Sequence, residues 1–205
     1  MAPMADFVVT GTGRCGTAHC WRTLMRMGIP AAHETFFDLD RRAFSDADAR
    51  AYEAFPTNDV ALMAAPFLHQ LSTPSIHIIR DPVATVNSFL HLRIDLRLPH
   101  PITDFINYWM EIEGETSEER WADYWEKWNR LCADSATFTV QVEALSDGTV
   151  SDAFFAPIIG DEGFVRCWQA GGVTPNRVHD VNSLMVSPRT ADRLRRAGEA
   201  FGYGA

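Results

Sequence analysis

Residues 7–17 of this 205-residue chain read FVVTGTGRCGT, and the interpretation of the whole sequence starts from this stretch. Its first four residues are apolar or β-branched, which is typical of a short buried strand. Glycines follow at positions 11, 13 and 16. Residues 17–27 then carry apolar side chains at helical spacing, and Gly28 supplies a stop. The sequence therefore predicts a strand, a glycine loop and a helix in direct succession.

The loop in this unit has the composition of an anion cradle. Small residues let backbone N–H groups approach an anion closely, and the N-terminus of the following helix adds a favourable dipole. Arg14 lies inside the loop, where a guanidinium can hold oxygens on which charge builds up during group transfer. A tight turn that binds nothing is the plainer alternative.

Two general loop patterns compete for this stretch. The nucleoside triphosphatase pattern GxxxxGK[ST] fits the spacing of Gly11 and Gly16, but Thr17 stands where a lysine is required. The dinucleotide pattern GxGxxG is satisfied by Gly11, Gly13 and Gly16. Glu34 also lies roughly where a ribose-binding acid is expected in that pattern. The dinucleotide pattern gives no role to the arginine of the loop.

Strands alternate with helices along the rest of the chain. This alternation is typical of an α/β fold, here a three-layer sandwich with a mostly parallel central sheet. The length suits one domain that spans residues 1–205. Further strands are predicted at 29–32, 60–63, 75–79 and 137–142, helices at 41–54, 82–91, 118–131 and 188–201, and an irregular segment at 93–114.

Composition argues against several classes of protein. The net charge is −9, so nucleic acid is a poor match as a partner. No segment approaches the roughly 18 apolar residues of a membrane span, and residues 1–6 lack the features of a secretion signal. We therefore expect a cytoplasmic protein without a membrane span. The four cysteines form no CxxC pair, so no metal site is expected, and the sequence carries no indication of an oligomeric state.

The first loop resembles that of the sulfotransferases that use 3′-phosphoadenosine 5′-phosphosulfate (PAPS), in which P-[KR]-S-G-T-[TS] follows a strand. The resemblance implies a fold like that of the P-loop nucleoside triphosphate hydrolases, and a reaction that needs no metal. It also implies that Arg14 stabilises the transition state. Cys15 replaces a common serine and Ala18 a hydroxyl residue, so these two positions offer backbone N–H groups only. The residues implied to bind the 5′-phosphosulfate are Gly13, Arg14, Cys15, Gly16, Thr17 and Ala18.

A second motif of the same family lies far along the chain. In these enzymes an arginine after an apolar strand and a serine eight residues later bind the 3′-phosphate of the donor. Arg80 follows the predicted strand at 75–79, and Ser88 comes eight residues later (88 − 80 = 8), about two turns along the next helix. Together the motifs imply transfer of a sulfuryl group from the co-substrate PAPS to a hydroxyl or amine. The plainer alternative pairs Arg80 with a carboxylate and leaves Ser88 without a role.

Several side chains are candidates for the base that accepts the proton of the acceptor. One branch of the family uses a glutamate about twenty residues after the loop cation, and Glu34 lies twenty residues after Arg14 (34 − 14 = 20). Other branches use a histidine, so His33, His69 and His77 are rivals. A base must lie within about 3 Å of the proton it removes, which the sequence does not show.

The acceptor is expected to be a small molecule, a carbohydrate or a lipid. Residues 93–116, the predicted loop or lid, and the aromatic face of the helix predicted at 118–131 are expected to shape its pocket. Phe36, Phe37, Trp109 and Trp121 are candidates to line it. The chain lacks the C-terminal glycine-rich nucleotide loop of the animal enzymes, for which Arg177 or Arg189 is a candidate substitute. Two other functions stay open: a dinucleotide-dependent oxidoreductase, and a non-catalytic nucleotide-binding domain.

Overall fold

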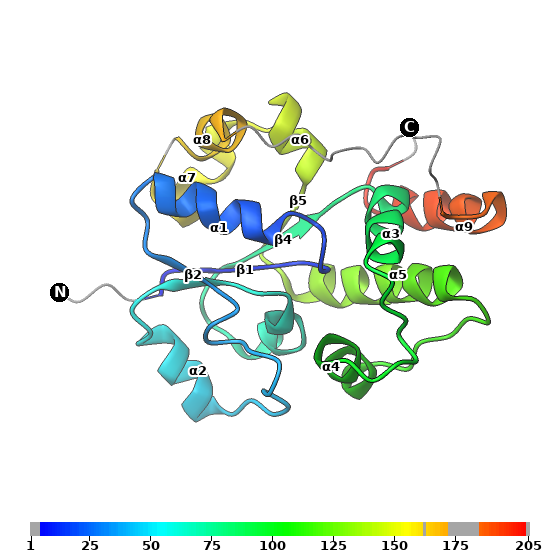
Figure 1. The fold of residues 1–205 in the computed structure, drawn as a ribbon. Coiled ribbons are helices and arrows are strands. Elements are labelled where there is room, and N and C mark those ends of the chain that lie inside the picture. The colour runs from blue at the N-terminus through cyan, green and yellow to red at the C-terminus, as the bar shows by residue number, and fades with distance from the viewer. Residues whose placement is uncertain (1–4, 162, 172–184, 204–205) are drawn as a thin grey trace.

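The computed structural model describes residues 5–161, 163–171 and 185–203. Its strands are β1 (Val8–Thr10), β2 (Ala31–His33), β3 (Asn58–Val60), β4 (Ser75–Ile79) and β5 (Phe138–Gln141). They form one sheet in the order β2-β3-β1-β4-β5, and every neighbouring pair runs parallel (Figure 1). The predicted α/β fold with a parallel central sheet is therefore confirmed.

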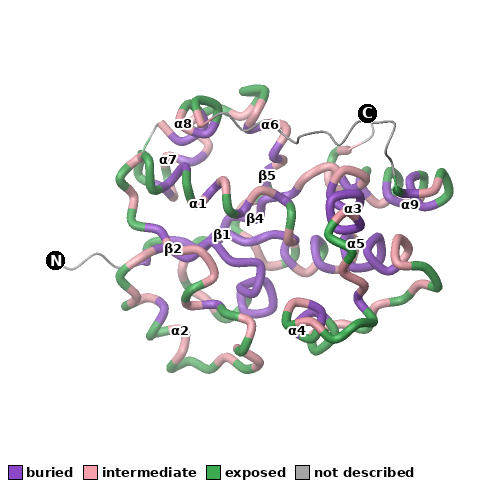
Figure 2. The backbone as a smooth tube through the Cα atoms, viewed as in Figure 1, coloured by how far each residue is buried: buried purple, intermediate pink, exposed green. Residues whose placement is uncertain are grey.

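Helices cover both faces of this sheet and complete the three layers. They are α1 (Thr17–Arg26), α2 (Asp46–Glu53), the 3₁₀ helix η1 (Leu62–Gln70), α3 (Pro82–His91), α4 (Pro101–Trp109), α5 (Ser117–Ser135), α6 (Val142–Asp147), the 3₁₀ turn η2 (Asp152–Phe154), α7 (Ala156–Ile159), α8 (Phe164–Ala170) and α9 (Pro188–Glu199). One apolar core lies between the sheet and α1, α7 and α8, and a second between the sheet and η1, α3, α4, α5 and α9. In Figure 2 the buried backbone runs through the strands between these two layers.

The central strand is β1, which is buried along its whole length. Val9 is aligned with Val60 of β3 on one side and with Ile76 of β4 on the other. A parallel strand covered by helices on both faces must be apolar throughout, and residues 7–9 meet this requirement. A Cβ on Gly11 would lie 2.3 Å from the Ile78 carbonyl oxygen, so only glycine fits where the chain leaves β1.

The strand order bears on the dinucleotide alternative. In both common dinucleotide- and flavin-binding orders, 3-2-1-4-5-6 and 2-1-3-4-5, the second strand is a direct neighbour of the first. Here β3 separates β1 from β2. Glu34 follows β2, so it does not lie on the strand next to the glycine loop, where a ribose-binding acid belongs. The topology therefore differs from that of a dinucleotide-binding fold.

The segment 93–114 was predicted to be irregular, and this is wrong because it contains α4. Pro101 occupies the first turn of the helix, where a missing N–H group leaves no bond unmade. The His100 side chain accepts a hydrogen bond from the Ile102 N–H at 3.2 Å and caps the helix. Phe105 then enters the second apolar core. Two prolines that indicate a loop in the sequence thus mark the start of a helix.

The predicted strand at 60–63 is also shifted in the structure. β3 begins at Asn58, whose side-chain oxygen accepts the N–H groups of Asp6 and Phe7 at 2.8 and 3.0 Å. From Leu62 the chain continues as η1. The helix predicted at 41–54 begins only at α2, after a capping box. Among the described residues, no helix is both long and apolar enough to cross a bilayer.

Candidate active site

The loop between β1 and α1 takes a left-handed backbone conformation at two places. The φ angle is 67° at Arg14 and 104° at Gly16. This conformation costs a residue with a side chain about 1–2 kcal/mol, so the fold maintains strain at Arg14. No side chain caps the first turn of α1 and no acidic residue lies in it. The start of α1 can therefore offer its N–H groups and its dipole to an anion.

Cys15 lies beneath the loop and is fully buried. Burial raises the pKa of its thiol to about 12, so the sulfur stays protonated near neutral pH. Its N–H donates to the Thr12 carbonyl at 3.3 Å within the loop. Cys15 is one of the six residues implied to bind phosphosulfate, but its N–H group already donates a hydrogen bond within the loop.

Arg14 joins the two predicted anion sites. Its Nε donates to the Ser88 Oγ at 3.0 Å, and its carbonyl oxygen accepts from the Arg80 Nη1 at 2.8 Å. The loops after β1 and β4 meet because these strands are neighbours, with Thr10 aligned to His77. Burial lowers the pKa of the Arg80 guanidinium, while the nearby charge of Glu143 opposes this shift. Two motifs 66 residues apart in sequence are thereby linked through one arginine.

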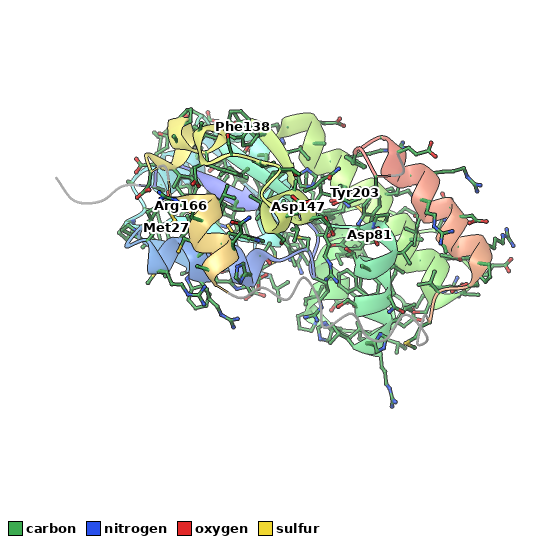
Figure 3. All side chains as sticks on the ribbon, turned by 90° about the horizontal axis from the view of Figure 1, so that it is seen from above. Met27, Asp81, Phe138, Asp147, Arg166 and Tyr203 are labelled. Atoms are coloured by element: carbon green, nitrogen blue, oxygen red, sulfur yellow. The ribbon has the colours of Figure 1, made fainter. Side chains whose placement is uncertain are left out.

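A small network holds the turn that follows Arg80. Glu143 accepts the Asp81 N–H at 3.1 Å and the Tyr203 hydroxyl at 2.8 Å. The same hydroxyl lies 3.1 Å from the Ile79 carbonyl oxygen at the end of β4. Figure 3 shows Asp81 and Tyr203 beside one another at this place. The Asp81 side chain accepts the Ala84 N–H at 2.7 Å, so a carboxylate already caps α3.

His33 is the last residue of β2 and Glu34 follows it, and both border the same cavity as the loop. Glu34 also has a left-handed backbone, with φ of 54°. Burial raises the pKa of its carboxyl, the charge of His33 opposes this, and the charge of Asp59 adds to it. The His33 Nε2 is buried and has no hydrogen-bond partner among the described residues. A carboxyl with a raised pKa beside an unpartnered imidazole is suited to accept a proton.

The other two candidate bases lie elsewhere. His77 is fully buried in β4, and its ring nitrogens lie 3.1 Å from the Thr139 hydroxyl and 2.9 Å from the Asn129 side-chain oxygen. Burial lowers its pKa to about 4, so this imidazole is neutral at pH 7. His69 is exposed on η1, beside Gln70. Neither borders the cavity described next.

A cavity of about 440 Å³ brings the predicted residues together. Residues 13–18, Arg80, His33 and Glu34 border one part of it. Ser88 is buried and does not border the cavity, but its hydroxyl accepts a hydrogen bond from Arg14, which does. The other part is an apolar wall, in which the rings of Phe89 and Trp121 stack with centroids 4.0 Å apart. The wall consists of Leu62, Phe89, Leu92, Ile94, Ile102, Trp121 and Tyr124.

Some of the predicted lining residues lie outside this cavity. Of the four aromatic candidates only Trp121 borders it. Phe36 and Phe37 pack on Tyr52 in the apolar core, and Trp109 packs on Phe67. Residues 93–116 contribute Ile94 and Ile102 to the wall. Arg189 lies on α9 and does not border the cavity, and Arg177 lies outside the described residues.

The sequence analysis missed His19 and Arg22, which also border the cavity, as does Tyr124 of the aromatic helix expected to shape the pocket. His19 and Arg22 project from α1, and the helical spacing from Ala18 to Arg22 gives the only sequence indication of this. Tyr124 belongs to the aromatic face of α5, and its hydroxyl has no partner among the described residues. Three arginines and one glutamate border the cavity, so it is locally cationic in a chain of net charge −9.

The described residues contain no group of three or more His, Cys, Asp or Glu side chains that could hold a metal ion. Comparison with known proteins adds little to this geometry. No protein-family model matches the chain, and no curated protein matches it. One solved structure, a sulfotransferase from Alicyclobacillus acidocaldarius, is similar at 12% sequence identity and a TM-score of 0.49, over 98% of this chain and 97% of that one. A likeness this distant supports no statement about function, which has to be inferred from the site itself.

Proposed function

We propose that this protein is a sulfotransferase that moves a sulfuryl group from PAPS to a hydroxyl or amine of a small acceptor. One observation carries the proposal: the loop after β1 and the arginine after β4 meet at Arg14 and border one cavity. The resemblance assigns these two motifs to the two ends of one nucleotide: the loop to the 5′-phosphosulfate, and Arg80 with Ser88 to the 3′-phosphate. A dinucleotide oxidoreductase has no need of the pair Arg80 and Ser88.

In this proposal the donor lies against the cationic part of the cavity. The uncapped start of α1 and Arg14 take the 5′-phosphosulfate. Arg80 takes the 3′-phosphate together with the Ser88 hydroxyl, once Arg14 has released that hydroxyl. The Arg14 guanidinium, which donates to the uncharged Ser88 hydroxyl here, exchanges this hydrogen bond for stronger ones to the anion, in which donor and acceptor are both charged. No metal is required, since arginines and N–H groups can balance the charge.

Transfer forms a bond from the acceptor oxygen or nitrogen to sulfur and breaks the bond from sulfur to the phosphate oxygen of the donor. Adenosine 3′,5′-bisphosphate leaves with that electron pair, and nothing becomes attached to the enzyme. The acceptor proton goes to Glu34, with His33 as the alternative base. Arg14 neutralises the charge that develops on the transferred group, as positioning and electrostatics do in phosphoryl transfer.

The apolar wall is the proposed acceptor side of the cavity. It meets the loop where Phe89 lies against Gly13, because a Cβ on this glycine would come 3.1 Å from the ring. An acceptor on this wall has its reactive group between Arg14 and Glu34, which both border the cavity. The aromatic rings suit a phenol, a sugar face or a lipid chain.

Calorimetric titration with adenosine 3′,5′-bisphosphate tests the proposal. We expect the wild type to bind, Arg80→Ala to bind at least tenfold more weakly, and Arg195→Ala to bind normally. Arg195 is a matched control because it pairs with Asp192 on the surface of α9. Absence of binding by the wild type would rule out the proposed donor. Binding of a nicotinamide dinucleotide instead would favour an oxidoreductase, and donor binding without transfer to a broad panel of acceptors would favour a non-catalytic domain.

A further inference from the structure

Four successive backbone N–H groups after β2 are fixed by residues of β3. The Glu34 N–H donates to the Val60 carbonyl at 3.3 Å. The N–H groups of residues 35, 36 and 37 all donate to the Asp59 carboxylate, at 3.3, 2.8 and 2.9 Å. Asp59 is fully buried, and its own N–H donates to the Tyr52 hydroxyl at 3.1 Å. A buried carboxylate that accepts three N–H groups fixes the backbone around it.

The turn held in this way starts at Glu34, one of three described non-glycine residues with positive φ. Such a conformation persists only where the surrounding structure enforces it. The three hydrogen bonds to Asp59 supply that constraint directly after Glu34. If they were lost, Glu34 would relax to an ordinary backbone conformation, and its side chain would leave its present direction toward the cavity.

We propose that Asp59 is a positioning residue, whose carboxylate shapes the turn that presents Glu34 to the cavity. This inference rests on the proposed function, in which Glu34 accepts the proton of the acceptor. Asp59 does not border the cavity itself, so it acts on the reaction through Glu34. It also differs from an ordinary core residue, because a neutral side chain of the same shape could not replace all its hydrogen bonds.

Besides shaping the turn, Asp59 also affects the pKa of Glu34 through its charge. Burial raises the pKa of Glu34, and the like charge of Asp59 raises it further, against the effect of His33. Loss of the Asp59 charge therefore lowers the pKa of Glu34, and a reaction that needs ionised Glu34 keeps its rate to lower pH. Besides Glu34, the charged or titratable groups that border the cavity are Arg14, Cys15, His19, Arg22, His33, Arg80 and Tyr124.

Asp59→Asn tests the inference, because asparagine keeps the shape but loses the charge and at least one acceptor. We expect kcat to fall at least tenfold, the KM for PAPS to stay within twofold, and the acidic limb of the kcat profile to move to lower pH. The control is Asp123→Asn. That carboxylate is also buried and accepts a backbone N–H, from Glu113 at 2.8 Å, but it does not border the cavity and pairs with Lys127 and Arg193. The control should leave the pH profile unmoved.

A double substitution separates positioning from general destabilisation. If Asp59 acts through Glu34, then Asp59→Asn should lower kcat less than twofold in a Glu34→Gln background. An equal loss in both backgrounds would overturn the inference, and so would an unmoved acidic limb in Asp59→Asn.

The outcomes also separate this inference from the proposed function. A wild type that neither binds adenosine 3′,5′-bisphosphate nor transfers sulfate overturns both. A wild type that does both, beside an Asp59→Asn enzyme with normal kcat and profile, overturns only the role of Asp59. Should Asp59→Asn not fold, amide hydrogen exchange of the wild type decides: the amides of residues 36 and 37 should exchange as slowly as those of β3. Exchange at the rate of exposed loops would overturn the inference.

Discussion

Arg14 is the residue on which the proposed site depends most. Its backbone is left-handed, its Nε donates to Ser88, and its carbonyl oxygen accepts from Arg80. A side chain with these constraints is held in place before any ligand binds. Such preorganised donors contribute most where charge develops in a transition state.

We therefore expect Arg14→Ala to lower kcat about 10²–10³-fold, which corresponds to about 2–4 kcal/mol of transition-state stabilisation. Steady-state kinetics with PAPS and any accepted substrate measure this, with Arg195→Ala as the control. Normal turnover by Arg14→Ala would remove the arginine from the mechanism.

At the scale of single elements, the start of α1 lacks the stabilisation that α2 and α5 have. Its first turn has neither a side-chain cap nor an acidic residue, although α2 and α5 both begin with a capping box. A helix without a side-chain cap or an acidic first-turn residue keeps the N–H groups of its N-terminus available for a ligand. Ala18, an exposed residue of this turn, borders the cavity.

Ala18→Asp should therefore have opposite effects on stability and on binding. The carboxylate complements the helix dipole and adds about 0.3–1 kcal/mol to the free energy of unfolding. It also repels an anionic ligand, so we expect affinity for adenosine 3′,5′-bisphosphate to fall at least tenfold. Thermal unfolding and calorimetry measure the two effects, and Ala18→Asn is the uncharged control. Unchanged affinity in Ala18→Asp would show that the anion does not bind at this helix.

The elements differ in how far the sequence predicts them. β1 is an apolar run that ends in glycines, and β4 is one that ends at Arg80. Such local patterns can be recognised from the sequence alone. α4 was missed because proline stops a helix in its interior but starts one at its first turn, and the sequence does not distinguish the two places. The start of β3 was missed because Asn58 is polar, and only the structure shows that its side chain is satisfied by Asp6 and Phe7.

At the scale of the whole molecule, His77 connects three elements through hydrogen bonds. From β4 it reaches Thr139 on β5 and Asn129 on α5. Its pKa, lowered to about 4 by burial, lies below the 6.5 of an exposed histidine. Between these values the unfolded chain binds more protons than the folded one, so stability falls as the pH drops.

We expect the free energy of unfolding to decrease by up to about 3 kcal/mol between pH 6.5 and pH 4 on account of this residue. Urea unfolding at a series of pH values measures the slope. In His77→Gln the slope should flatten, whereas His69→Gln, which changes an exposed histidine, should retain it. The same slope in wild type and His77→Gln would refute the assignment.

Tertiary packing, a property of the whole molecule, explains why the sequence predicted only part of the site. The resemblance to known motifs indicated Arg14, Arg80 and Ser88, because these motifs lie at the ends of strands that can be recognised in the sequence. Tyr124 borders the cavity only because α5 packs against α3 and η1, and Asp59 matters only because β3 lies beside β2. Such relations depend on tertiary packing, which no local pattern records.

The stack of Phe89 on Trp121 has a practical consequence. An indole that forms part of the cavity wall changes its surroundings whenever a molecule displaces the water in front of it. The protein thus carries a native optical reporter where the proposed acceptor would lie. Because the chain has six tryptophans, unknown compounds could be screened for a change in emission that the wild type shows and Trp121→Phe does not, without a label and before any reaction has been observed.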